Sequence, residues 1–198
     1  MNLRIAPQQL HGAITPPASK SQAHRLIMGA ALAGGSSVLR SVSGSNDITA
    51  TLGCMEALGA KSKQLDDTTL QITGNAGNSA PAGQVLDCGE SGSTLRFLIP
   101  VAAALGVSAR FTGAGRLGER PLSVYEDTLL SRGVTWRREE GGWLPLSIEG
   151  RLLPGEFRVR GDVSSQFITG LLLALPLLKE DSEIILTTPL ESEPYVTL

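Results

Sequence analysis

Three short turns rich in hydroxyl groups carry the side chains best suited to chemistry, and an apolar run follows each turn. The first, residues 18–25 (ASKSQAHR), contains a lysine and an arginine. The second, residues 86–96 (LDCGESGSTLR), ends in an arginine, whereas the third, residues 159–168 (VRGDVSSQFI), has none at the equivalent place. Such a turn predicts the start of a helix, where unpaired backbone N–H groups and the helix dipole favour an anion.

Basic side chains accompany these predicted helix starts. Lys20 and Arg25 flank the first, Arg96 ends the second turn, and Arg120 follows in the loop GERP at residues 118–121. If the three helix starts open on one surface, they predict an anion-binding site. The alternative is that the arginines pair with neighbouring carboxylates, and that the third turn only caps its helix.

The composition argues against several classes of protein. A net charge of -2 in 198 residues, with 4% aromatic residues, argues against a nucleic-acid partner. No apolar run reaches the roughly 18 residues of a membrane span, and the start lacks the pattern of a signal peptide. We therefore expect no membrane association and a cytoplasmic location. Cys54 and Cys88 have no CxxC spacing, which predicts buried, reduced thiols and no metal site.

The elements that position the turns recur along the chain. Helices are expected at residues 20–33, 94–105 and 166–178, and each precedes a strand. Strands are also expected within residues 3–14 and 37–42, with Asn46 and Asp47 capping a further helix. The pattern predicts an α/β fold of repeated units at about residues 14–83, 84–153 and 154–198, the last incomplete. Pro100 and Pro176 are expected to kink buried, parallel first helices.

We considered three other functional motifs, and the sequence supports none of them. Residues 113–118 (GAGRLG) match the dinucleotide-binding pattern GxGxxG, but the third glycine leads into Glu-Arg-Pro and does not open a helix. Lys20 is unsuited as a base for Ser19 or Ser21, because adjacent residues at a helix start point apart. The chain also has no P-loop sequence.

Five motifs, in order and spacing, resemble the 5-enolpyruvylshikimate-3-phosphate (EPSP) synthase family. They are residues 17–25 (PASKSQAHR), 87–97 (DCGESGSTLRF), 118–122 (GERPL), 161–167 (GDVSSQF) and 192–196 (SEPYV). The resemblance implies two domains, each with three βαβαββ units around buried parallel helices. It also implies transfer of the enolpyruvyl group of phosphoenolpyruvate to the 5-hydroxyl of shikimate-3-phosphate, with release of phosphate and without a cofactor.

The same resemblance implies two substrate sites. Residues for shikimate-3-phosphate would be Lys20, Ser21, Arg25, Ser164, Ser165, Gln166, Ser192 and Tyr195, and residues for phosphoenolpyruvate would be Lys20, Gly92, Arg120 and Gln166. Ser21 and Arg25 would hold the shikimate ring and carboxylate, and the serines its phosphate. Gly92 would leave room for phosphoenolpyruvate and for the inhibitor glyphosate.

The sequence departs from the family pattern in two respects. Glu90 and Ser93 stand where asparagine and threonine are common, so Glu90 either points away from the anion site or pairs with Arg96. The chain also matches only the N-terminal half of the pattern. Residues 14–198 would form the shikimate-3-phosphate-binding domain, and residues 1–13 a strand of the other domain's sheet.

This partial coverage has a functional consequence. The proton-transferring residues would lie in the C-terminal domain, so this chain alone is expected to be inactive and to need that domain as its partner. Two alternatives stay open: an enzyme like UDP-N-acetylglucosamine enolpyruvyl transferase, and a non-catalytic anion-binding domain.

Overall fold

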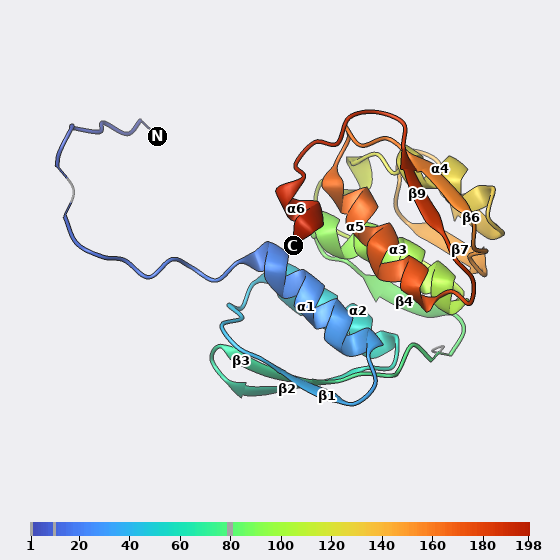
Figure 1. Cartoon of the computed structure of the whole chain (residues 1–198), viewed down its shortest axis with the longest axis horizontal. Helices are drawn as coiled ribbons and strands as arrows, with labels where there is room; N and C mark the ends of the chain where they lie inside the picture. The colour runs from blue at the N-terminus through green and yellow to red at the C-terminus, as the bar shows by residue number, and fades with distance from the viewer. Residues whose placement is uncertain (1, 10, 79–80) are drawn as a thin grey trace.

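The β-strands form three separate sheets, each covered by helices (Figure 1). A computed structural model describes residues 2–9, 11–78 and 81–198. The first sheet has the order β1-β3-β2, the second β4-β5-β7-β6 and the third β8-β9. The strands are β1 (Ser36–Leu39), β2 (Lys61–Asp66), β3 (Thr69–Thr73), β4 (Gln84–Asp87), β5 (Ala109–Thr112), β6 (Val134–Arg138), β7 (Leu146–Gly150), β8 (Glu156–Val159) and β9 (Glu183–Leu186). β4 pairs with β5, and β8 with β9, in parallel, and the other pairs are antiparallel.

The helices alternate with these strands, which confirms the predicted α/β class. They are α1 (Lys20–Leu32), α2 (Asn46–Ala57), α3 (Gly92–Leu105), α4 (Ser123–Leu130), α5 (Ser165–Ala174) and α6 (Pro194–Thr197), with 3₁₀ turns η1 (Leu117–Glu119) and η2 (Leu175–Leu177). Apart from η1, the order from β4 to β7 is strand, helix, strand, helix and two strands. The predicted unit boundaries, after residues 83 and 153, fall in connections between strands.

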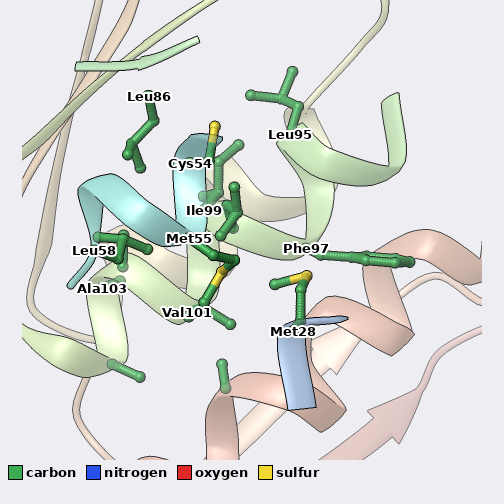
Figure 2. Packing of buried hydrophobic residues seen from close by; sticks show 14 of the residues in the cluster. Met28, Cys54, Met55, Leu58, Leu86, Leu95, Phe97, Ile99, Val101 and Ala103 are labelled. Carbon is green, nitrogen blue, oxygen red and sulfur yellow. The ribbon is translucent and has the colours of Figure 1, made fainter. Parts of the chain in front are cut away.

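Helix α3 forms the centre of the hydrophobic core. Twelve of its 14 residues are buried, and only Ser93 and Arg96 are partly accessible. It packs against α5 on one side and contacts α1 and α2 on the other. Figure 2 shows Met28 of α1 and Met55 of α2 in one cluster with Phe97, Ile99 and Val101 of α3. The burial predicted for this helix is confirmed.

Pro100 lies inside α3, and a tyrosine from another helix compensates for it. Proline has no backbone N–H, so the carbonyl of Arg96, four residues earlier, loses its helical donor. The hydroxyl of Tyr125 on α4 is 2.8 Å from this carbonyl and 2.7 Å from that of Phe167 on α5. Complete burial raises the pKa of Tyr125 well above its usual value, which keeps its proton in place. One hydroxyl therefore joins three helices.

Several predicted boundaries were wrong. The third apolar helix ends at Ala174, and Pro176 lies in the 3₁₀ turn η2 rather than within α5. This placement satisfies the backbone, because a proline in a first turn needs no N–H donor. Ser45, rather than Asn46 or Asp47, caps α2: its hydroxyl accepts from the N–H of Ile48 at 3.3 Å. The expected strand at residues 37–42 is shorter and starts earlier, as β1.

The predicted N-terminal strand does not form within the described residues. Residues 2–9 and 11–14 are exposed and contain no strand, and Ile5 and Ile14 are about nine-tenths accessible. A strand needs a partner backbone, and the three sheets offer these residues no ladder. The assignment of residues 1–13 to another domain's sheet stays a prediction.

The two cysteines are free and buried, as predicted. They lie on α2 and in the turn before α3, and contact between them raises the pKa of Cys88, as does its burial. Cys88 therefore remains a neutral thiol in the core.

Candidate functional site

The helices α1, α3 and α5 begin at the same side of the molecule (Figure 1). Each has a serine as its N-cap. The hydroxyls of Ser19, Ser91 and Ser164 accept from backbone N–H groups in the first turn at 3.3, 3.2 and 3.3 Å. Ser19, rather than Ser21, is therefore the cap of α1. The positive ends of three helix dipoles thus face one region of the surface.

Gly92, the first residue of α3, lies at the centre of a cluster of polar side chains. A methyl group built on Gly92 would lie 2.8 Å from Nη1 of Arg120, 3.7 Å from Nη1 of Arg96 and 3.7 Å from Oε1 of Gln166. Arg96 donates to Oε1 of Gln166 at 2.7 Å, and Gln166 donates through Nε2 to Ser93 at 2.9 Å. We call Gly92, Arg96, Arg120 and Gln166 the Gly92 cluster. The structure therefore brings together the predicted residues Gly92, Arg120 and Gln166.

The Gly92 cluster carries unbalanced positive charge. Burial lowers the pKa of Arg96, and the neighbouring Arg120 lowers it further. The Arg96 guanidinium lies 4.8 Å from the ring centre of Phe167, and neither arginine is ion-paired in the described parts of the chain. The alternative that Arg96 pairs with a carboxylate is thus wrong for these residues. Two adjacent guanidiniums without an acid favour an anionic ligand.

Glu90 forms no ion pair with Arg96 in the described part of the chain. It is exposed, and its carboxyl group is so close to Gly115 that a methyl group there would meet Oε1 at 2.8 Å. Of the two possibilities for this residue, the structure supports the one in which it points away.

Arg25 forms a second cluster, which joins α1, α5 and α6. Its guanidinium donates to the carbonyl of Ser21 at 2.8 Å, to the hydroxyl of Thr169 at 3.0 Å and to the carbonyl of Tyr195. It also lies 5.2 Å from the ring centre of Phe97. These partners are neutral, so the charge of Arg25 is uncompensated, and its burial lowers the pKa. The predicted residues Ser21, Arg25 and Tyr195 are therefore in contact.

Lys20 is paired with an acid. Its Nζ lies 2.5 Å from Oδ2 of Asp47, the second residue of α2. The first turn of α3 is adjacent, since the hydroxyl of Thr94 is 3.5 Å from the Asp47 carbonyl. An anion that binds Lys20 must compete with this carboxylate.

The remaining predicted residues lie near the start of α5 and before α6. Ser164 caps α5, and Ser165 is buried one helical turn before Thr169, which contacts Arg25. Ser192 is exposed with a positive φ of 57°, and its carbonyl accepts from the N–H of Tyr195 at 3.0 Å. The serines at the start of α5 are therefore linked to the Arg25 cluster through Thr169 on the same helix, and not by direct contact with Arg25.

Sequence reasoning missed Thr169, which belongs to the Arg25 cluster, and Asp47, which pairs with Lys20. Thr169 follows Ser165 by four residues, so its position on the same helix face could have been found once α5 was expected. Asp47 lies in the first turn of α2, where an acid is ordinarily explained by the helix dipole.

Other kinds of site receive no support from the described residues. A cavity of about 530 Å³ lies beside η2, lined by residues such as Leu172, Leu175 and Lys179, and none of the predicted site residues lines it. Within the described ranges no group of three acids, histidines or cysteines could hold a metal ion. None of the described helices has the length and apolar character needed to cross a membrane.

Helix starts that converge beside two clusters of cations are typical of anion-binding α/β proteins. Comparison with known proteins narrows this class. A family model described as EPSP synthase (3-phosphoshikimate 1-carboxyvinyltransferase) matches residues 5–198. The chain therefore belongs to the EPSP synthase family.

Individual relatives agree with this assignment. The chain is 48% identical to a 3-phosphoshikimate 1-carboxyvinyltransferase from Clostridium kluyveri, over 98% of this chain and 45% of the relative. It is 45% identical to one from Clostridium beijerinckii, over 100% of this chain and 46% of the relative. The solved EPSP synthase from Acinetobacter baumannii has a TM-score of 0.80 and 27% identity, over 94% of this chain and 42% of that chain. The sequence thus spans less than half the length of these relatives.

Proposed function

We propose that this chain is the shikimate-3-phosphate-binding half of an enolpyruvyl transferase. The full-length protein would transfer the enolpyruvyl group of phosphoenolpyruvate to the 5-hydroxyl of shikimate-3-phosphate and release phosphate. The observation that carries the proposal is the Gly92 cluster, in which Arg96 and Arg120 lie side by side without an acid. A substrate with a carboxylate and a phosphate supplies the missing negative charge.

The Arg25 cluster suits the other substrate. Its guanidinium, held by the carbonyls of Ser21 and Tyr195, can donate hydrogen bonds to the carboxylate of shikimate-3-phosphate. Ser164, Ser165 and Ser192 are the hydroxyls we assign to its phosphate, with Gln166 between the two substrates. Lys20 would contact either ligand after leaving Asp47. We add Arg96 to the phosphoenolpyruvate residues Lys20, Gly92, Arg120 and Gln166, because it adjoins all but the lysine.

The second half of the relatives would supply the rest of the site. Within this chain the two clusters consist of cations, hydroxyls and an amide, and the carboxylate of Asp47 is occupied by its ion pair with Lys20. We therefore assign proton transfer to a C-terminal domain, and expect no turnover from this chain alone. The family match favours the shikimate enzyme over a UDP-N-acetylglucosamine enolpyruvyl transferase and over a non-catalytic domain.

Calorimetric titration with shikimate-3-phosphate tests the proposal. The wild-type chain is compared with Arg25→Ala, and with Arg116→Ala as a matched control. Arg116 is exposed and pairs with Glu119 at 2.9 Å, outside both clusters. A charged hydrogen-bonding group contributes about 1.5–3 kcal/mol, so Arg25→Ala should weaken binding by at least about tenfold. The control should bind as the wild type does.

Two results would contradict the assignment. Equal affinity of Arg25→Ala and wild type would remove Arg25 from the ring site. Absence of binding by a chain that circular dichroism shows to be folded would mean that the helix starts form no site without the second domain. In that case the domain is added in trans, and enolpyruvyl transfer is measured as phosphate release.

A further inference from the structure

A buried chain of hydrogen bonds lies directly behind the candidate site. Nδ1 of His24 is 2.8 Å from the hydroxyl of Thr51, which is 2.7 Å from that of Thr94. The hydroxyl of Thr94 is in turn 2.7 Å from that of Ser91, the N-cap of α3. All four side chains are at most 1% accessible. This series of hydrogen bonds begins at His24 on α1, passes through Thr51 on α2 and ends at Ser91, next to Gly92.

Two pairs of side chains, one exposed and one buried, connect α1 to α2, and the hydrogen-bonded series contains the buried pair. Lys20 and His24 are one helical turn apart on α1, and their partners Asp47 and Thr51 are one turn apart on α2. Thr51 also donates to the Asp47 carbonyl at 3.1 Å, and this carbonyl is 3.5 Å from the Thr94 hydroxyl. The buried pair, His24 and Thr51, therefore fixes the backbone that carries the exposed pair of Lys20 and Asp47.

An imidazole at position 24 lowers the stability of the fold relative to an apolar ring. Nε2 of His24 is buried and has no partner among the described residues. A buried polar atom without a hydrogen bond is destabilising, whereas an apolar ring of similar shape would avoid that penalty. The neighbouring edge-to-face contact with Phe97, at 6.4 Å between ring centres, would suit such a ring equally well. What an apolar ring cannot provide is the hydrogen bond from Nδ1 to Thr51.

We propose that His24 is a positioning residue for the anion site, acting through Thr51 and Thr94 on the first turns of α2 and α3. This inference rests on the proposed function. His24 itself does not reach the ligand. Burial lowers its pKa to about 4, so it is neutral near pH 7 and contributes geometry rather than charge. The distance from Gly92 to Lys20 and Asp47 is set by this buried chain.

A pair of substitutions at position 24 separates positioning from packing. His24→Asn places an amide near Nδ1 and can keep the bond to Thr51, whereas His24→Phe keeps a ring and loses the bond. Thr51→Val removes the hydroxyl with little change of shape, and serves if His24→Phe does not fold. Binding of shikimate-3-phosphate and of phosphoenolpyruvate is titrated, together with urea unfolding and hydrogen exchange of the Thr94 amide.

We expect His24→Phe and Thr51→Val to weaken substrate binding about tenfold or more. His24→Asn should keep most of the wild-type affinity. The Thr94 amide, which donates to Ser91, should exchange faster in the two weakened variants and normally in His24→Asn. A merely structural role would instead lower stability and binding alike in all three. Wild-type affinity in Thr51→Val would overturn the inference.

The proposed function can fail separately. If the wild-type chain binds neither substrate, the substrate assignment is lost, and hydrogen exchange alone decides the role of His24. Selective acceleration at Thr94 in His24→Phe and Thr51→Val would still support positioning of α3. Unchanged exchange at this amide would overturn it.

Discussion

Gly92 is the residue whose lack of a side chain most directly shapes the candidate site. In Gly92→Ala the added methyl group would lie 2.8 Å from Nη1 of Arg120, so this arginine must move. Because Arg120 is exposed and its contact atom ends a flexible side chain, we expect the fold to be kept. Binding of phosphoenolpyruvate should weaken a few-fold, and that of the bulkier glyphosate more than tenfold. Competition calorimetry on both ligands measures the two effects.

The control for this substitution is Gly53→Ala on α2, where an added methyl group meets no atom within 4 Å. It should leave both affinities unchanged. An equal loss for phosphoenolpyruvate and glyphosate in Gly92→Ala would show that Gly92 does not discriminate between them by size.

His24 makes the stability of the protein depend on pH. Burial lowers its pKa from 6.5 to about 4; the nearby Lys20 and Arg25 also lower it, while Asp47 opposes them. The unfolded chain therefore binds a proton at a higher pH than the folded chain. The contribution of neutral His24 to the free energy of unfolding is fully present above pH 6.5. It is lost as the pH falls toward 4, and the loss is roughly 3 kcal/mol at most.

Urea unfolding of wild type and His24→Asn at several pH values measures this effect. Acids such as Asp162, whose pKa Arg160 and Thr188 hold low, also reduce stability in acid. They do so in both proteins, so the difference between the two curves isolates His24. A difference that does not change between pH 7 and 4.5 would contradict the lowered pKa.

At the scale of single residues, the family resemblance predicted some of the side chains that lie together, but not all their partners. Gly92, Arg120 and Gln166 converge as the motifs implied. The partners of Arg96 and His24 could not be predicted, because Gln166 and Thr51 lie 70 and 27 residues away. Such contacts depend on how helices pack, and a single sequence contains no direct record of helix packing.

At the scale of elements, the contact between α3 and α5 depends on Gly170. A methyl group there would meet the Tyr125 hydroxyl, and would lie 2.5 Å from the Arg96 carbonyl and 3.1 Å from Cγ of Pro100. Two of these groups belong to the backbone or to a rigid ring and cannot move aside. We expect Gly170→Ala to lower the free energy of unfolding by about 2–3 kcal/mol.

Gly53→Ala provides the comparison for Gly170→Ala, since both change a helical glycine to alanine. In α2, with open space around it, alanine should raise the free energy of unfolding by up to about 1 kcal/mol through its higher helix propensity. Urea unfolding of both variants therefore separates packing from propensity. Equal signs for the two would argue against close contact at Gly170.

The elements themselves were largely predictable, because caps and glycines mark their ends. Ser19 begins α1, and Gly106 ends α3 in a left-handed conformation with φ 70°. The end of α5 was misplaced because an apolar run continues to Leu178 while the helix changes to a 3₁₀ turn at Leu175. Hydrophobic pattern alone does not distinguish these two kinds of turn.

At the scale of the whole molecule, the N-terminal segment contributes little to the fold. The described residues before residue 14 are exposed and contain neither helix nor strand. A chain that starts at residue 14 should therefore unfold within about 0.5 kcal/mol of the full chain. A chain that starts at Ser21 loses the Ser19 cap and should be less stable by about 1 kcal/mol or more. Urea unfolding of the two shortened chains tests this difference.

The separation of the three sheets has a consequence for the covalent chain. In the described parts of the chain, no ladder joins one sheet to another. Pro81 and Ala82 are exposed and lie between β3 and β4. Cleavage of the peptide bond between them would leave every strand pair within one fragment. The two fragments would still share the apolar contacts of α1 and α2 with α3, so we expect them to stay associated after this cleavage.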